Sequence, residues 1–388
     1  MTELITPVHL SVTDAELADL HDRLSRVRWP EGRTVTDTSQ GPTPEKLRAL
    51  TDYWRDHYDW RRCESELNGL GQFRTTIDGL DIDFLHIRSP EPDALPLLMT
   101  HGWPGSVLEF RKVIGPLTDP VAHGGDARDA FHLVLPTLPG FGFSAKPGET
   151  GWNLGRIAEA WITLMNDRLG YDRWAAQGGD LGCGVTDEIA RRTPAGLIGM
   201  HLNFAMFGPT PEEIAEATPQ EQAMLGSAKY FWDQLSGYAK QQSTRPQTIG
   251  YSLADSPVGL AAWLYAMFQD TCGTPGDAEA SFTLDEMLDD IMLYWLPNSA
   301  ASAARLYWEM AQAGWAAPAT VKDPTTLPTG FTMPPKEHVR KSQRWLERRY
   351  GNIVYFNELP EGGHFTALEQ PEAFTADVRA TFRPLRLS

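Results

Sequence analysis

The sequence predicts an α/β fold, with a mostly parallel central sheet and a block of helices inserted into the core. Short apolar segments such as "LPLLMT" and "GLIGMHLNFA" have the composition of buried parallel strands, and helix-like segments alternate with them. From about residue 209 the pattern changes to helix-like segments rich in tryptophan and tyrosine, which we interpret as an inserted helical cap. The run 352–382 then returns to strand, loop and helix, which closes the core.

The composition is that of an acidic globular protein. The chain has 388 residues, of which 41% are hydrophobic and 22% charged, and its formal net charge is -17. This charge argues against nucleic-acid partners and against docking to anionic membranes, because both need basic surfaces. The N-terminus has neither a basic segment nor a long apolar run, so we expect no membrane partner and a cytoplasmic protein. Three distant cysteines argue against a disulfide framework: Cys63, Cys183 and Cys272.

The chain divides into four regions. The first region has a helix that begins after Thr13, a second helix over 43–60, and a hairpin around Asp78 and Gly79. Because parallel strands end at one edge of a sheet, we expect the loops after the strands to form the ligand site. We predict an N-terminal meander over residues 1–90 and the first part of the core over residues 91–208. A helical cap follows over residues 209–328, and the second part of the core over residues 329–388.

The segment "WAAQGGDLGCGVTDEIA" (174–190) has the pattern of a strand, a glycine cluster and a helix. This is the pattern of a nucleophile elbow, a sharp strand-to-helix turn that requires small neighbours. Asp180 stands where such an elbow normally presents a serine, among Gly178, Gly179 and Gly182. A carboxylate at a helix N-terminus stays ionised, and it can attack an electrophilic carbon directly to form an ester. A glycine-rich strand end with an aspartate N-cap is the structural alternative.

Two further motifs occur in the order that an elbow enzyme requires. "HGWPGS" (101–106) follows a buried strand, and the backbone N–H groups of Trp103 and Leu181 are candidates for an oxyanion hole. "PEGGHF" places His364 in a glycine-flanked loop, where a neutral imidazole can deprotonate water if a carboxylate fixes its tautomer. Each motif alone is compatible with an ordinary turn or loop, but their order favours catalysis.

The chain resembles the microsomal-type epoxide hydrolases, which have the α/β-hydrolase fold. The resemblance rests on "RVRWPEG", "HGWPGS", "LPGFGFS", "GGDLG", "SPVGLAAW" and "GGHF", and it extends over essentially the whole chain, including the meander that wraps the core. It implies that the protein hydrolyses the cyclic ether of an epoxide to a vicinal diol. The reaction passes through a covalent aspartyl ester and needs no metal ion and no cofactor. Asp180 matches the nucleophile of the family and His364 its base.

The resemblance also implies roles for a carboxylate and two tyrosines. The partner of the histidine matches Glu337 in "PKEHVRKSQRW", with Asp323 as the alternative. The two cap tyrosines that donate to the epoxide oxygen match Tyr238 and Tyr307. We interpret their neighbours Tyr251 and Tyr265 as cap packing.

The substrate pocket is expected to include residues beside the nucleophile. We expect Trp103, Pro104 and Leu181 to border the substrate. The family often has tryptophan at the position of Leu181, so this wall of the pocket should be smaller and aliphatic, while the backbone N–H keeps its role.

Two other functions are open at this point. A haloalkane or haloacid dehalogenase shares the aspartate and histidine but needs halide-binding donors in place of paired tyrosines. A non-catalytic ligand-binding relative would keep the pocket and often lose a catalytic residue.

Among epoxide hydrolases, soluble bacterial members lack the microsomal membrane anchor, and some act in the biosynthesis of enediyne antibiotics. This setting suits a small-molecule epoxide that is bulky or aromatic. A homodimer is a candidate assembly.

Overall fold

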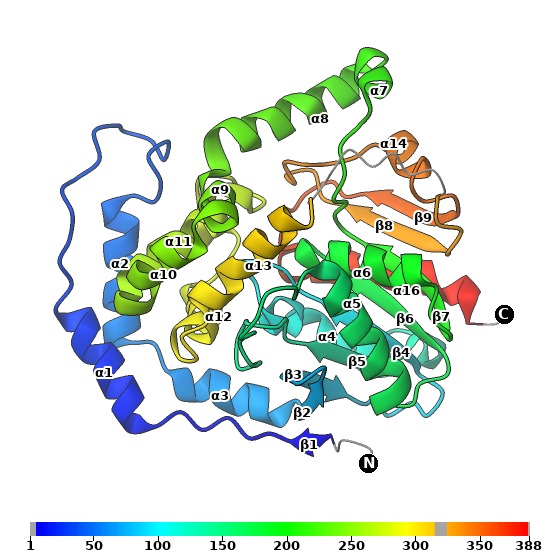
Figure 1. The fold of residues 1–388 in the computed structure, drawn as a ribbon, viewed down its shortest axis with the longest axis horizontal. Coiled ribbons are helices and arrows are strands. Elements are labelled where there is room, and N and C mark those ends of the chain that lie inside the picture. The colour runs from blue at the N-terminus through cyan, green and yellow to red at the C-terminus, as the bar shows by residue number, and fades with distance from the viewer. Residues whose placement is uncertain (1–4, 315–323, 387–388) are drawn as a thin grey trace.

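The computed structural model describes residues 5–314 and 324–386. These residues form a nine-stranded sheet with the strand order β1-β2-β3-β5-β4-β6-β7-β8-β9 (Figure 1). The six strands from β5 to β9 in this order are parallel, whereas β1, β2 and β3 are antiparallel, so the predicted mostly parallel sheet of an α/β-hydrolase fold is confirmed. The strands are β1 (Thr6–Pro7), β2 (Gln72–Ile77), β3 (Leu80–Ile87), β4 (Leu95–Thr100), β5 (Phe131–Pro136), β6 (Trp174–Gly178), β7 (Leu197–Leu202), β8 (Thr329–Met333) and β9 (Ile353–Glu358).

Helices cover both faces of this sheet. Helices α5 (Leu154–Ile162) and α6 (Leu181–Arg192) pack together on one face, while α4 (Arg111–Thr118) and α16 (Pro371–Phe382) pack together on the other. Every residue of β4 and β5 is buried, which is the expected state of parallel strands that are covered on both sides. The sheet is therefore a rigid base for the loops at its carboxyl edge.

The N-terminal meander runs around the outside of the core (Figure 1). Helix α1 (Asp14–Ser25) begins at the predicted cap, where the Thr13 hydroxyl accepts a hydrogen bond from the Glu16 N–H. The predicted hairpin is also confirmed, because β2 and β3 pair across Asp78 and Gly79, which both have positive φ.

One helix of the meander differs from the prediction. The pattern over 43–60 predicted a single helix, but α2 (Pro44–Asp56) ends at Asp56 and α3 (Trp60–Gly69) starts a new direction. The Asp59 side chain accepts a hydrogen bond from the Arg61 N–H, which stabilises the start of α3. A local cap thus outweighs the continuous apolar pattern.

Helices α7 to α13 form the cap between β7 and β8, above the carboxyl edge of the sheet (Figure 1). Within the described part of the chain, none of the helices has the length and apolar character needed to cross a membrane. The cap helices are α7 (Pro211–Ala215), α8 (Pro219–Tyr230), α9 (Gly237–Thr244), α10 (Pro246–Asp255), α11 (Pro257–Thr271), α12 (Leu284–Trp295) and α13 (Ala300–Gln312).

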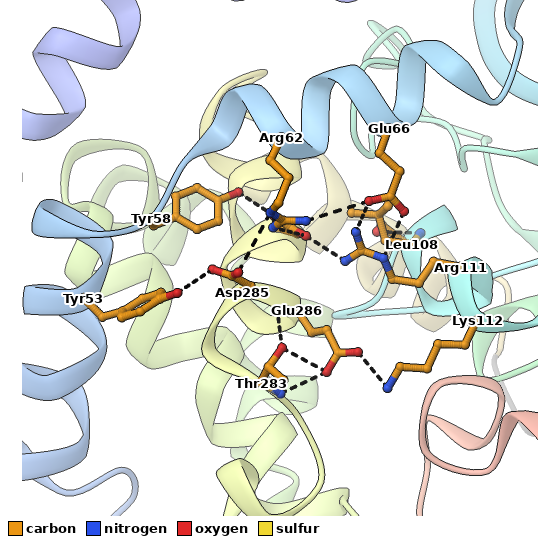
Figure 2. Close-up of polar contacts among 12 residues, drawn as sticks. Tyr53, Tyr58, Arg62, Glu66, Leu108, Arg111, Lys112, Thr283, Asp285 and Glu286 are labelled. Atoms are coloured by element: carbon orange, nitrogen blue, oxygen red, sulfur yellow. Dashed lines mark hydrogen bonds and ion pairs between the residues drawn. The ribbon is translucent and has the colours of Figure 1, made fainter.

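A buried ion-pair cluster joins meander, core and cap. Asp289 of α12 has no exposed side-chain surface, and its two oxygens lie 2.6 Å from Arg62 of α3 and 2.7 Å from Arg111 of α4. The Tyr58 hydroxyl donates to the same carboxylate at 2.7 Å. Figure 2 shows Tyr58, Arg62 and Arg111 converging from the meander and the core. Because the carboxylate has no exposed surface, its charge depends on the two arginines and on the tyrosine hydroxyl in place of water.

We predict that Asp289→Ala lowers the free energy of unfolding by about 3 to 5 kcal/mol, because two arginines then lose their buried counter-charge. The matched control is Asp255→Ala, whose side chain is 89% exposed, and it should change stability by less than about 0.5 kcal/mol. Urea unfolding midpoints measure both. Equal shifts for the two variants would show that the cluster does not hold the cap.

Candidate active site

The topology brings the loops after β4 and β6 together. These two parallel strands are neighbours, and their last residues, Thr100 and Gly178, are paired. Residues 101–103 and 179–181 therefore leave the sheet side by side at its carboxyl edge, where open α/β sheets bind ligands. The loops after β8 and β9, which carry Glu337 and His364, leave the same edge.

Asp180 lies on a sharp turn between β6 and α6. Its φ of 47° and ψ of -123° are unusual for a residue with a side chain, and such strain persists only where the surroundings impose it. The surroundings here are glycines. A Cβ on Gly182 would lie 1.9 Å from the Thr100 carbonyl oxygen, and a Cβ on Gly102 would lie 2.3 Å from Asp180 Oδ1. The glycine cluster thus permits a contact that no other residue type would allow.

The Asp180 carboxylate is held by a backbone N–H group and lies at the start of a helix. The Trp103 N–H donates to Oδ1 at 3.0 Å. Leu181 directly follows Asp180 and is the first residue of α6, so its N–H has no partner within the helix. The two N–H groups predicted to form the oxyanion hole therefore belong to the loop after β4 and to the first turn of α6, which is the positively polarised end of that helix.

His101 fixes the loop that carries Trp103. Its Nδ1 lies 3.0 Å from the Gly102 carbonyl oxygen, and its Nε2 accepts a hydrogen bond from the Leu138 N–H at 3.2 Å. Burial lowers the pKa of His101 to about 4, so the ring is neutral and each nitrogen has one fixed role. The Trp103–Pro104 peptide bond in this loop is cis.

His364 lies between two carboxylates. Its Nε2 is 3.4 Å from Asp180 Oδ2, and its Nδ1 is 2.5 Å from Glu337 Oε2. The other Glu337 oxygen accepts a hydrogen bond from the Val339 N–H at 3.0 Å. Burial lowers the pKa of His364, but the charges of Glu337 and Asp180 outweigh burial and hold the pKa well above its usual range. These two carboxylates therefore favour the protonated form of the histidine in the resting site.

The two predicted tyrosines come from the cap and face the same space. Tyr238 on α9 stacks on the Trp103 ring with centroids 4.6 Å apart, and Tyr307 on α13 meets that ring edge-on at 5.9 Å. A side-chain hydrogen bond links the two tyrosines. Burial and the nearby Asp180 charge raise the pKa of both hydroxyls, so both are protonated at neutral pH.

A cavity of about 420 Å³ joins these groups. Asp180, His364, Glu337, Tyr238 and Tyr307 all line it, together with Trp103 and Leu181. Most of the remaining lining is apolar, and half of it comes from the loop after β7 and from α8. Its volume is typical of a pocket for a small organic molecule.

Four other residues named in the sequence analysis do not line the cavity or lie outside the described residues, and for Tyr251 and Tyr265 an absence from the site is the predicted outcome. Pro104 is buried but does not line the cavity. Tyr251 is 71% exposed, and the Tyr265 hydroxyl donates to Glu279 at 2.9 Å away from the cavity, so neither joins the site. Asp323, the alternative partner of the histidine, lies outside the described residues.

The sequence analysis missed two acidic residues behind the histidine. Glu109 lines two small cavities of about 10 Å³ each, one shared with Asp180 and His364 and the other with Asp290. Each has room for about one water molecule. Burial raises the pKa of Glu109 well above its usual range and that of Asp290 to about 8. The only signal in the sequence was a glutamate within the otherwise apolar run "VLEF".

The fold and the aspartate, histidine and glutamate at its carboxyl edge define a hydrolase of the α/β-hydrolase class. Residues 96–244 match the family model "alpha/beta hydrolase fold", and residues 5–110 match "Epoxide hydrolase N terminus". Epoxide hydrolase 1 of Oryctolagus cuniculus is 33% identical over 401 residues, covering 97% of this chain and 88% of its own length. A homologue in Stigmatella aurantiaca (strain DW4/3-1) is 52% identical over 382 residues, covering 98% of this chain and 86% of its own length.

Solved structures agree with the sequence comparisons. The epoxide hydrolase of Aspergillus niger superposes with a TM-score of 0.87 at 30% identity, covering 99% of this chain and 97% of that one. The juvenile hormone epoxide hydrolase of Bombyx mori superposes with a TM-score of 0.90 at 27% identity, covering 99% and 95%. The chain belongs to the epoxide hydrolase family and is an enzyme of that kind.

We predict that Gly102→Ala lowers kcat for epoxide hydrolysis by about 100-fold or more, because the new Cβ would lie 2.3 Å from Asp180 Cβ and Oδ1 and displace the carboxylate. Gly226→Ala is the control, since nothing lies within 4 Å of a Cβ there, and it should keep the wild-type rate. Steady-state turnover of styrene oxide measures both, with circular dichroism to verify folding. A folded Gly102→Ala enzyme with wild-type kcat would contradict the close approach.

Proposed function

We propose that the protein converts an epoxide to a vicinal diol through a covalent ester on Asp180, which a water activated by His364 then hydrolyses. The observation that carries this proposal is the surroundings of one carboxylate. Asp180 accepts a hydrogen bond from the Trp103 N–H at 3.0 Å, lies 3.4 Å from His364, and shares a cavity with Tyr238 and Tyr307.

In the first step, Asp180 Oδ2 attacks one carbon of the oxirane and that C–O bond breaks. Oδ1 is held by the Trp103 N–H, so it becomes the carbonyl oxygen of the ester. Negative charge develops on the epoxide oxygen, and the hydroxyls of Tyr238 and Tyr307 donate hydrogen bonds to it. The raised pKa values of both tyrosines keep them in the donating form.

The proton balance assigns His364 a role in both steps. Two carboxylates raise the pKa of the resting imidazole, and esterification of Asp180 removes the charge of one. The pKa of His364 then falls, and the proton that it releases neutralises the opened epoxide oxygen. The ester intermediate therefore contains a neutral histidine that can act as a base.

In the second step, neutral His364 takes a proton from water as the water oxygen attacks the ester carbonyl carbon. The N–H groups of Trp103 and Leu181 stabilise the tetrahedral anion. As it collapses, the bond between the carbonyl carbon and the alkyl oxygen breaks, and that oxygen takes the proton of the new Asp180 carboxyl group, which releases the diol and leaves Asp180 ionised and His364 protonated, as at the start. Glu337 stabilises the imidazolium through its 2.5 Å contact with Nδ1. Glu109 lines the one-water cavity shared with Asp180 and His364, which supports a role in holding the attacking water.

Paired tyrosines favour this reaction over the two alternatives. A dehalogenase must stabilise a departing halide, whereas two adjacent phenols suit an oxygen that stays attached and gains a proton. A non-catalytic relative has no need to keep nucleophile, base, carboxylate and both tyrosines on one cavity. The mainly apolar lining supports a bulky or aromatic epoxide as substrate.

The proposal is tested by trapping the ester. His364→Gln removes the base but leaves the nucleophile, so incubation with styrene oxide should leave one substrate mass on the peptide that contains Asp180. Intact-protein and peptide mass spectrometry measure this adduct.

The control is the double variant Asp180→Asn/His364→Gln, which should remain unlabelled. An unlabelled His364→Gln protein that nevertheless forms diol would exclude the ester. An adduct formed from 1-bromohexane with release of bromide, and none from styrene oxide, would favour the dehalogenase.

A further inference from the structure

One flank of the substrate cavity carries two basic side chains within its otherwise apolar lining. Arg340 and Lys341 lie between Glu337 and helix α14 (Gln343–Glu347), and both line the cavity. Lys341 is only 3% exposed. Lysine is almost never buried to this degree unless a partner compensates its charge, so the position calls for an explanation.

No carboxylate of the described residues forms an ion pair with Lys341. Its ammonium donates one hydrogen bond, to the Val339 carbonyl oxygen at 2.7 Å. The two oxygens of the nearby Glu337 are already engaged by His364 and by the Val339 N–H. Burial lowers the pKa of Lys341 to about 8, and Glu337 offsets only part of this effect. The ammonium therefore has donors to spare next to the cavity.

Two side chains beside Lys341 also have buried N–H donors without an acceptor. Among the described residues, the buried Arg340 Nε and the buried Trp345 Nε1 have no hydrogen-bond partner. Both side chains line the cavity, and Trp345 is 1% exposed. Arginine, lysine and the indole N–H are donors only, so this flank is built for a group that supplies acceptors and negative charge.

We propose that the natural substrate is an epoxide that also carries a carboxylate, and that Lys341 and Arg340 bind this carboxylate while Asp180 attacks the oxirane. This inference rests on the proposed function and adds a substrate class to it. The net charge of -17 repels anions at long range, so recognition has to come from contacts inside the cavity. Buried charge-assisted hydrogen bonds are the strong, specific kind.

The test compares matched acids and esters. The probes are 4-(oxiran-2-yl)benzoate, its homologue with a propanoate side chain, and the methyl ester of each. The wild-type enzyme should prefer at least one acid over its ester by about 10-fold or more in kcat/KM. Lys341→Met should lower this acid-to-ester ratio by about 10-fold or more, and Arg340→Met should lower it in the same direction.

Lys229→Met provides the matched control, because Lys229 lies on α8 with a 75% exposed side chain, and it should keep the wild-type ratio. Arg340 is only partly buried, so its variant keeps the test valid if Lys341→Met does not fold. Higher salt should reduce the preference for the acid if the flank is reached by water.

The outcomes separate this inference from the proposed function. Turnover of both esters at least as fast as of both acids would overturn the carboxylate assignment and leave the epoxide hydrolase mechanism standing. An acid-to-ester ratio of kcat/KM that is unchanged in both Lys341→Met and Arg340→Met would likewise overturn the carboxylate assignment alone. Failure to turn over any of the four probes, with no adduct on Asp180, would overturn the mechanism, and the carboxylate assignment would fall with it.

Discussion

The site depends on the close approach of the loop after β4 to Asp180. The last residues of β4 and β6 are paired, and glycines at 102 and 182 let the two loops approach within distances that a Cβ would forbid. This contact holds Asp180 in a strained conformation and directs the Trp103 N–H at its carboxylate. The local cost is offset by the buried sheet and helices below, and the Asp180 carboxylate is held in one position by the fold itself.

The cap carries Tyr238 and Tyr307, and it is attached to the core partly through the loop after β4. The Tyr294 hydroxyl of α12 donates to the Gly105 carbonyl oxygen at 2.8 Å, within the segment that carries Trp103. Asp289 on the same helix is held by arginines from the meander and the core. The N-terminal meander thus fixes a cap helix that contacts the loop after β4. This arrangement gives the meander a physical role in holding the cap against the edge of the sheet that carries Asp180.

The sequence predicted the parts of the molecule that depend on local pattern. Glycines around Asp180 predicted the turn, and apolar strands that alternate with helices predicted the parallel sheet. Contacts between distant segments left no comparable signal. Glu109, Asp290 and Lys341 matter through burial and through neighbours that only the folded chain brings near. Likewise, the break before α3 depends on a single cap, Asp59, within an apolar pattern that continues across it. The roles of the site residues remain predictions to be tested by experiment.

The origin of the oxygen in the product tests the central claim most directly. In a single turnover of styrene oxide with excess enzyme in H₂¹⁸O, the new diol oxygen should come from the Asp180 carboxylate. The first diol released should therefore be unlabelled, and the peptide containing Asp180 should gain ¹⁸O. A first-turnover diol that already carries ¹⁸O, with an unlabelled Asp180 peptide, would mean that water attacks the epoxide directly and would contradict the covalent mechanism.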